Sequence, residues 1–157
     1  MGATDPEDTS NASRREILDD HAHVRGLLGG LEEHLDRPVE PEAEWRSELQ
    51  VTLSDLHRRL QRHFKSEEKG GVHERLMQEA PRLAHRLDEL FADHPAILER
   101  LTGLLASLSE EGGASPLDVR ALTDGTRQLI EQLSEHEASE NEVMLDAYWD
   151  DLGGEGG

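Results

Sequence analysis

The sequence predicts an all-α fold, an antiparallel up-down-up-down four-helix bundle with a two-fold internal repeat. Leucines recur at helical spacing in four long stretches, and clusters of Pro and Gly separate these stretches. A shift of 73 positions aligns the second half of the chain with the first without a gap. Short connections between long helices give antiparallel neighbours. The repeat is the strongest of these three observations for the fold class, because it identifies the unit from which the chain is built.

The repeat relates histidines and glutamates as well as leucines. In each copy, one histidine on the first expected helix and a His-x-x-x-Glu motif on the second recur in the same register. These residues are His21, His63 and Glu67 in the first copy, and His94, His136 and Glu140 in the second. The leucines in the same register are Leu28 and Leu101, Leu31 and Leu104, Leu49 and Leu122, Leu56 and Leu129, and Leu60 and Leu133.

Two helices are expected in the first half of the chain. The first spans about residues 13–36, where a Ser-x-x-Glu capping-box pattern precedes an apolar periodic run. The second begins near Pro41, which the first turn of a helix accepts, and ends at Gly70 and Gly71. Residues 72–78 favour one short helical continuation.

The third expected helix begins at Pro81 and extends to about residue 108. Pro95 lies inside it and removes one backbone hydrogen bond. We therefore expect a kink beside His94, and a complete break of the helix is the alternative.

The fourth helix is expected to start at the Ser-Pro pair of residues 115–116, which reads as an N-cap followed by Pro at the first helical position. It extends to about Trp149. In this interpretation residues 1–12 form a disordered tail, residues 13–149 form the bundle, and residues 150–157 form a flexible Gly-rich tail.

The composition excludes several classes of protein. The 157 residues include 35 acidic and 16 basic side chains, a formal charge of −19, so binding to nucleic acid or to an anionic membrane surface is not expected. The absence of cysteine excludes disulfides, thiolate zinc sites, iron–sulfur clusters and cysteine nucleophiles. No apolar run has membrane-spanning length, and the polar start lacks the features of a signal peptide. We therefore expect a cytoplasmic protein.

The repeated histidines and glutamates lie on the inner faces of the expected helices. Four residues turn an α-helix by about 400°, so Glu67 projects only about 40° round from His63. A histidine or glutamate in a leucine core costs several kcal/mol unless it is paired or binds a metal. Four imidazoles and two carboxylates suit iron, manganese or zinc, and two ions about 3.5–4 Å apart are the usual arrangement. The pattern therefore predicts a dimetal site.

The remaining histidines have weaker signals. A single inward histidine is more commonly a hydrogen-bonded core residue than a metal ligand. His34 and His85 project away from the ligand faces, and His57 lies about 120° from His63, so we expect these three side chains to be exposed.

Several residues near the motifs are candidates for supporting roles. His73, Glu74 and Glu68 could complete a coordination sphere, because open iron sites often take extra ligands. Asp20 and Asp93 each precede a candidate ligand in the sequence. Adjacent helical residues do not share a face, so we expect both to be exposed, and an outer contact to a ligand histidine is the alternative.

Taken together, these motifs resemble the hemerythrin-like family, in particular the bacterial HHE cation-binding domains. The resemblance covers about residues 13–149 and rests on Asp20-His21, His63-Phe64-Lys65-Ser66-Glu67-Glu68, Asp93-His94 and His136 to Glu140. It implies a four-helix bundle and a cofactor of two iron ions, a non-haem di-iron centre with an oxo or hydroxo bridge. It also implies terminal ligands at His21, His63, His94 and His136, and bridging or terminal carboxylates at Glu67 and Glu140.

The sequence departs from the oxygen-carrying members of that family at two positions. Leu90 stands one turn before His94, where the carriers have a histidine, and Asn141 stands five residues after His136, where they have an aspartate. Fewer protein ligands leave more positions for water, peroxide, nitric oxide or oxygen. The departures therefore argue against reversible oxygen storage.

The first functional hypothesis is a protein that binds or senses O₂, NO or iron at the di-iron centre. The alternative is a di-iron redox enzyme that decomposes hydrogen peroxide, as a catalase does, or a related oxidative-stress protein. No Ser/His/Asp set or phosphate-binding loop is evident, so catalysis could rest only on the metal. A third option is a structural bundle or iron-storage helper. The expected partner is a small diatomic or peroxide ligand, and the sequence identifies no protein partner.

Overall fold

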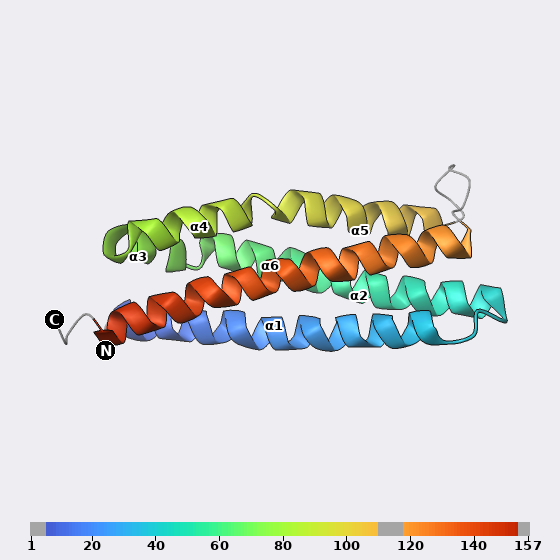
Figure 1. Ribbon diagram of the computed structural model, residues 1–157, viewed down its shortest axis with the longest axis horizontal. Coiled ribbons are helices and arrows are strands. Elements are labelled where there is room, and N and C mark those ends of the chain that lie inside the picture. Colours follow the sequence, from blue (N-terminus) through green and yellow to red (C-terminus); the bar gives the residue numbers. More distant parts are fainter. Residues whose placement is uncertain (1–5, 110–117, 154–157) are drawn as a thin grey trace, which may run out of the picture.

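The computed structural model describes the backbone of residues 6–109 and 118–153, and the side chains of residues 15–109 and 118–147. The fold is an all-α bundle of four rods, and the chain passes along it up, down, up and down (Figure 1). The helices are α1 (Pro6–Asp36), α2 (Glu42–Lys69), α3 (Val72–Glu79), α4 (Pro81–Phe91), α5 (His94–Leu108) and α6 (Val119–Gly153). Helices α4 and α5 together form the third rod. Helix α1 packs against α2 and α6, and α5 also packs against α2 and α6.

Helix α1 begins earlier than the capping-box pattern indicates. It starts at Pro6, so residues 6–12, which we expected in a disordered tail, are helical, and residues 1–5 lie outside the described part. Pro suits the first helical position, where its missing N–H needs no partner. The helix therefore starts at this proline rather than near residue 13.

The connection between α2 and α3 depends on Gly71. Its φ angle of 83° is left-handed, a conformation that costs glycine little because it has no Cβ atom. Helix α2 therefore ends at Lys69 and α3 begins at Val72, which confirms the short helix expected over residues 72–78.

The third rod is broken rather than kinked. Helix α4 ends at Phe91, the chain turns through Ala92 and Asp93, and α5 begins at His94 with Pro95 in its first turn. Pro95 has no N–H to donate and would clash with the carbonyl one turn back, so a new helix start accommodates it where a continuous helix does not. The alternative of a complete break is therefore correct.

Helix α6 has its own N-terminal cap. The backbone N–H of Ala121 donates to Oδ1 of Asp118 at 2.7 Å, and the helix begins at Val119. The expected start at residues 115–116 lies outside the described residues. The helix continues to Gly153, beyond the expected end near Trp149, and residues 154–157 again lie outside the described part.

Two apolar clusters fill the bundle on either side of the histidines. The larger is leucine-rich and joins α1, α2, α5 and α6; its fully buried members include Leu31, Leu49, Leu53, Leu56, Leu60, Leu101, Leu122, Leu129 and Leu133. The smaller joins the start of α1, α3, α4 and the end of α6 and includes Ile17, Leu76, Leu83, Leu87 and Val143. Burying one such side chain contributes about 1.5–3 kcal/mol. No helix among the described residues is long and apolar enough to cross a membrane.

Candidate metal centre

All six predicted ligands converge between the two apolar clusters. They come from α1, α2, α5 and α6, and each is at most 5% exposed. The residues are His21, His63, Glu67, His94, His136 and Glu140. The leucines on the same helix faces as these side chains direct them inward, since residues three or four apart share a face of an α-helix.

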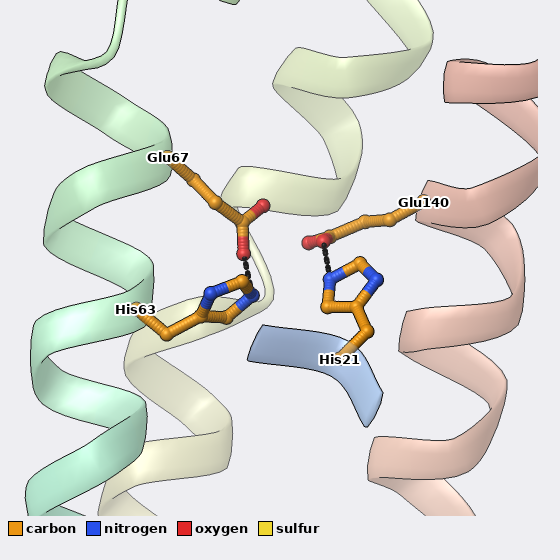
Figure 2. A group of neighbouring side chains, drawn as sticks. All are labelled: His21, His63, Glu67 and Glu140. Carbon is orange, nitrogen blue, oxygen red and sulfur yellow. Dashed lines mark hydrogen bonds and ion pairs between the residues drawn. The ribbon is translucent and has the colours of Figure 1, made fainter. Parts of the chain in front are cut away.

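The first group of ligand atoms belongs to His21, His63, Glu67 and Glu140, and these atoms lie within 4.8 Å of one another. Nε2 of His63 lies 2.5 Å from Oε1 of Glu67, and Nε2 of His21 lies 2.9 Å from Oε2 of Glu140. Figure 2 shows the two carboxylates facing each other above the two imidazoles. Oxygen and nitrogen atoms held this close can coordinate one cation.

The second group consists of His94, His136 and Glu140, again within 4.8 Å. Oε1 of Glu140 lies 2.5 Å from Nε2 of His136 and 3.3 Å from Nε2 of His94. Glu140 therefore belongs to both groups, with Oε2 toward His21 and Oε1 toward the other two histidines. The arrangement offers two adjacent cation positions that share one carboxylate.

Several of these buried atoms have no hydrogen-bond partner within the described part of the chain. They include Nε2 of His63, Nε2 of His136 and both carboxylate oxygens of Glu67. The short contacts within each His-x-x-x-Glu pair thus bring the atoms together without hydrogen-bond geometry. An unsatisfied buried polar atom costs about 1–3 kcal/mol. A cation between these atoms would remove that cost, so the residues fit a metal.

The two carboxyl groups respond to this environment in opposite ways. Burial and the neighbouring Glu140 carboxylate raise the pKa of Glu67 well above its ordinary value. Burial also opposes ionisation of Glu140, but contacts with His136, His21 and His94 outweigh it and hold the pKa of Glu140 well below its usual range. Burial lowers the pKa of His21, but contacts with Glu140 and Asn141 raise it overall. In the metal-free chain these shifts favour a proton on Glu67 and on His21, whose side chains also offer atoms that a cation would contact.

Each imidazole also has an oxygen near its outer nitrogen, Nδ1. These oxygens belong to Asn141 for His21 (2.8 Å), Asp20 for His63 (3.1 Å), Glu68 for His94 (3.1 Å) and Asp93 for His136 (3.7 Å). An Nδ1–H that donates outward leaves the Nε2 lone pair free for a metal. Asp20 and Asp93 are thus not merely exposed acids: each contacts the histidine of the following helix in its copy, not its sequence neighbour.

Two aromatic rings cover one side of the centre. The Phe64 ring stacks on His94 with centroids 3.7 Å apart, and the Phe91 ring lies 5.2 Å from the same imidazole. Phe64 is 4% exposed, so it closes this side to bulk water. Above it, a surface groove of about 620 Å³ runs between α2 and α5; Glu68, His94 and Pro95 are among its lining residues.

Three other candidates lie away from the ligand atoms. Nε2 of His73 lies 2.7 Å from Oδ1 of Asp88, and Glu74 is exposed. Glu68 contacts the outer nitrogen of His94 rather than joining either ligand group. Leu90, which replaces a histidine of the oxygen carriers, packs against the smaller apolar cluster.

The expectation that His34 is exposed is wrong. His34 is 6% exposed, its Nε2 lies 3.0 Å from the carbonyl oxygen of Trp45, and the two rings stack with centroids 5.1 Å apart. Trp45 of α2 covers a position that points away from the ligand face of α1, which the periodicity of α1 alone cannot reveal. His85 is exposed, as expected, and His57 is half-buried beside Thr102.

Sequence reasoning missed Glu137. This side chain is 4% exposed and neither carboxylate oxygen has a hydrogen-bond partner among the described residues. Burial raises its pKa to about 7, while His21 and His63 oppose that shift. The repeat could have indicated this burial, because the 73-residue shift relates Glu137 to Phe64, an aromatic residue of the kind that is usually buried. The centre thus has a ring on one side and a buried carboxyl group at the equivalent position.

Comparison with known families agrees with the geometry. The sequence model of the hemerythrin HHE cation-binding domain matches residues 13–148, nearly the whole described chain. Searches of curated proteins and of solved structures gave no significant match. The buried histidines and glutamates fit a metal-binding site, and the chain belongs to the hemerythrin HHE cation-binding domain family.

Proposed function

We propose that the protein holds a non-haem di-iron centre and binds or senses O₂, NO or iron there. The observation that supports this most strongly is the pair of buried ligand groups that share Glu140. A shared carboxylate fits two ions held close together, as in other two-metal sites. The mixed set of imidazole and carboxylate ligands fits iron.

The chain's residues have distinct roles in this proposal. His21, His63 and Glu67 would hold one ion, His94 and His136 would hold the other, and Glu140, which belongs to both groups, would serve both. Bound iron would supply redox chemistry and the capacity to bind a small ligand. The second group contains three ligand atoms against four in the first, so the position left open for a small ligand would lie on the His94 and His136 side.

The surroundings favour a small, weakly polar ligand. Phe64 and Phe91 form an apolar wall against His94, and the α2–α5 groove reaches this side from the surface. An apolar, water-poor wall costs little to occupy for O₂ or NO, whereas a charged ligand would lose its hydration there.

Metal analysis and spectroscopy test the proposal. Purified chain from iron-replete expression should contain about two irons per molecule, and anaerobic reduction followed by air should cycle the absorption bands of the centre. His63→Ala should lose iron and these bands, and the matched His57→Ala should keep both. A wild-type chain with no iron after such expression contradicts the proposal.

The alternative of a peroxide-decomposing redox enzyme rests on the same open position. Glu68 places a half-exposed carboxylate next to His94, on the side with fewer ligand atoms. Iron-loaded chain that consumes hydrogen peroxide, with turnover lost in His63→Ala and kept in His57→Ala, would favour the enzyme. Iron-loaded chain without turnover leaves binding as the function.

A further inference from the structure

The two halves of the centre differ in where their negative charge lies. The first half contains His21, His63 and Glu67, and the buried Glu137 carboxyl group lies near its two imidazoles. The second half contains His94 and His136 without a carboxylate of its own, and at the position equivalent to Glu137 it has Phe64. Both halves share Glu140. The first half is therefore richer in acidic groups inside the core.

Among the residues that surround the ligand groups, the second half has more negative charge than the first. The 73-residue shift that relates His21 to His94 also relates their outer partners, because Asn141 is the counterpart of Glu68. Nδ1 of His21 lies 2.8 Å from the neutral amide oxygen of Asn141, whereas Nδ1 of His94 lies 3.1 Å from the Glu68 carboxylate. The second half thus has a charged acceptor where the first has an uncharged one.

The outer partners of the other two histidines increase this difference. Asp20, which contacts His63, also lies 3.9 Å from the guanidinium of Arg59, which offsets part of its charge. Asp93, which lies 3.7 Å from His136, has the uncharged Gln132 at the position that the repeat relates to Arg59. The second half is therefore richer in outer negative charge.

An outer carboxylate has a known effect on a ligand histidine. A carboxylate that accepts the Nδ1–H bond fixes the ring orientation and makes Nε2 a stronger donor to the metal. Removing such a partner typically lowers metal affinity about 10–100-fold. The half that lacks its own carboxylate ligand is the half in which this effect matters most.

We propose that Glu68 is a positioning residue that strengthens His94 as a ligand and so retains metal in the half with fewer ligand atoms. Asn141 accepts from His21 in the first half but brings no charge to that imidazole, and there Glu67 offers a carboxylate within the ligand group itself. The inference rests on the proposed metal centre and specifies how its two positions differ. The second half can thereby keep an open position for a small molecule and still hold its ion.

Stepwise titration of the metal-free full chain with Co²⁺, followed by visible absorption, tests this role. In Glu68→Gln we expect one of the two cobalt equivalents to bind about 10-fold more weakly or worse, and the other to be unchanged. Glu68→Asp keeps the charge and should recover part of the loss. Because Glu68 is half exposed, the metal-free unfolding free energy should change by no more than about 0.5 kcal/mol.

Double variants identify the half concerned. In His94→Ala the second half is already disabled, so adding Glu68→Gln should cause no further loss. In His21→Ala, adding Glu68→Gln should still weaken the remaining equivalent by the same factor. Glu131→Gln, which removes an exposed carboxylate from α6, is the matched control and should leave both equivalents unchanged.

The outcomes separate the two proposals. If Glu68→Gln weakens neither equivalent, or weakens both equally, the role of Glu68 is overturned while the metal centre stands. If the wild-type chain binds no cobalt, the metal centre itself is overturned and the role of Glu68 with it.

Discussion

The leucine-rich cluster and the six-residue metal centre are equally buried but differ in what holds them together. Side chains such as Leu56 and Leu60 are 0% exposed and gain free energy from leaving water. Side chains such as His63 and Glu67 are also at most 2% exposed, yet Nε2 of His63 and both carboxylate oxygens of Glu67 have no hydrogen-bond partner among the described residues. The difference indicates that the cluster stabilises the fold whether or not a metal is bound, whereas a bound cation would satisfy the unpartnered atoms of the centre.

Metal withdrawal should have the largest effect, because it acts on the centre alone. At a metal concentration about 1,000 times the dissociation constant, binding contributes about 4 kcal/mol to the unfolding free energy. Removing metal with a chelator should therefore lower the thermal midpoint markedly, as measured by circular dichroism. In Glu140→Ala, which breaks both ligand groups, the chelator should have almost no effect. A chelator shift as large in Glu140→Ala as in wild type contradicts a shared ligand.

Leu56→Ala tests the leucine-rich cluster without changing the metal ligands. A leucine-to-alanine change at a fully buried position costs about 2–5 kcal/mol through lost burial and the cavity left behind. We expect this cost in both metal-free and metal-loaded chain, with metal stoichiometry unchanged, as measured by urea unfolding and metal analysis. A loss of metal in Leu56→Ala would mean that the two regions are not independent.

Glu137 provides a pH test of the buried polar region in the metal-free chain. The unfolded chain releases this proton near pH 4.5, and the folded chain releases it near pH 7. Between these values the folded state binds more protons, so its stability falls as pH rises. A shift of this size corresponds to about 3 kcal/mol at pH 8. Glu137→Gln should therefore stabilise the metal-free chain by up to about that amount at pH 8.

The same variant should gain only about 1 kcal/mol at pH 5, which lies just above the pKa of Glu137 in the unfolded chain and well below its pKa of about 7 in the folded chain. Urea unfolding at the two pH values measures the difference. The raised pKa of His21 acts in the same direction as that of Glu137, since the folded state keeps that proton to higher pH as well. Equal gains in Glu137→Gln at pH 5 and pH 8 would show that the buried carboxyl group is not the cause.

His57→Ala should have the smallest effect. His57 is half-buried, its Nε2 lies 3.4 Å from the Thr102 hydroxyl, and it belongs to neither apolar cluster nor ligand group. Substitutions at such positions usually change stability by about 0.5 kcal/mol or less. Thermal unfolding and metal content should match those of wild type, and a loss of metal would extend the centre beyond its six residues.

The sequence predicts the fold and the convergence of the six candidate ligands for one reason. Leucines at helical spacing establish an inner face on each rod, and the 73-residue repeat places His21, His63, His94 and His136 on those faces. Periodicity within a single helix is sufficient for this step, because each side chain's direction follows from its own helix. Their role as metal ligands remains a prediction.

Features that depend on two helices could not be predicted in the same way. The burial of His34 results from Trp45 of the next helix, and the contact of Asp20 is with His63 across the bundle. Glu137 is buried because α6 packs against its neighbours, although its residue type favours exposure. The break before His94 depends on the local backbone geometry around Pro95. The sequence pattern alone is compatible with either a kink or a break at this point.

The position of the six side chains along the rods determines where the chain can accept insertions. The turns at residues 37–41 and 70–71 lie outside the ligand motifs, so their lengths can change without rotating any ligand. One extra residue inside a helix would instead turn every later side chain by about 100°. Among the turns that the structure describes, the Ala92–Asp93 turn is the exception, since the next residue is His94. Grafted loops or fused domains should therefore be tolerated at the ends of the rods, but not at this turn.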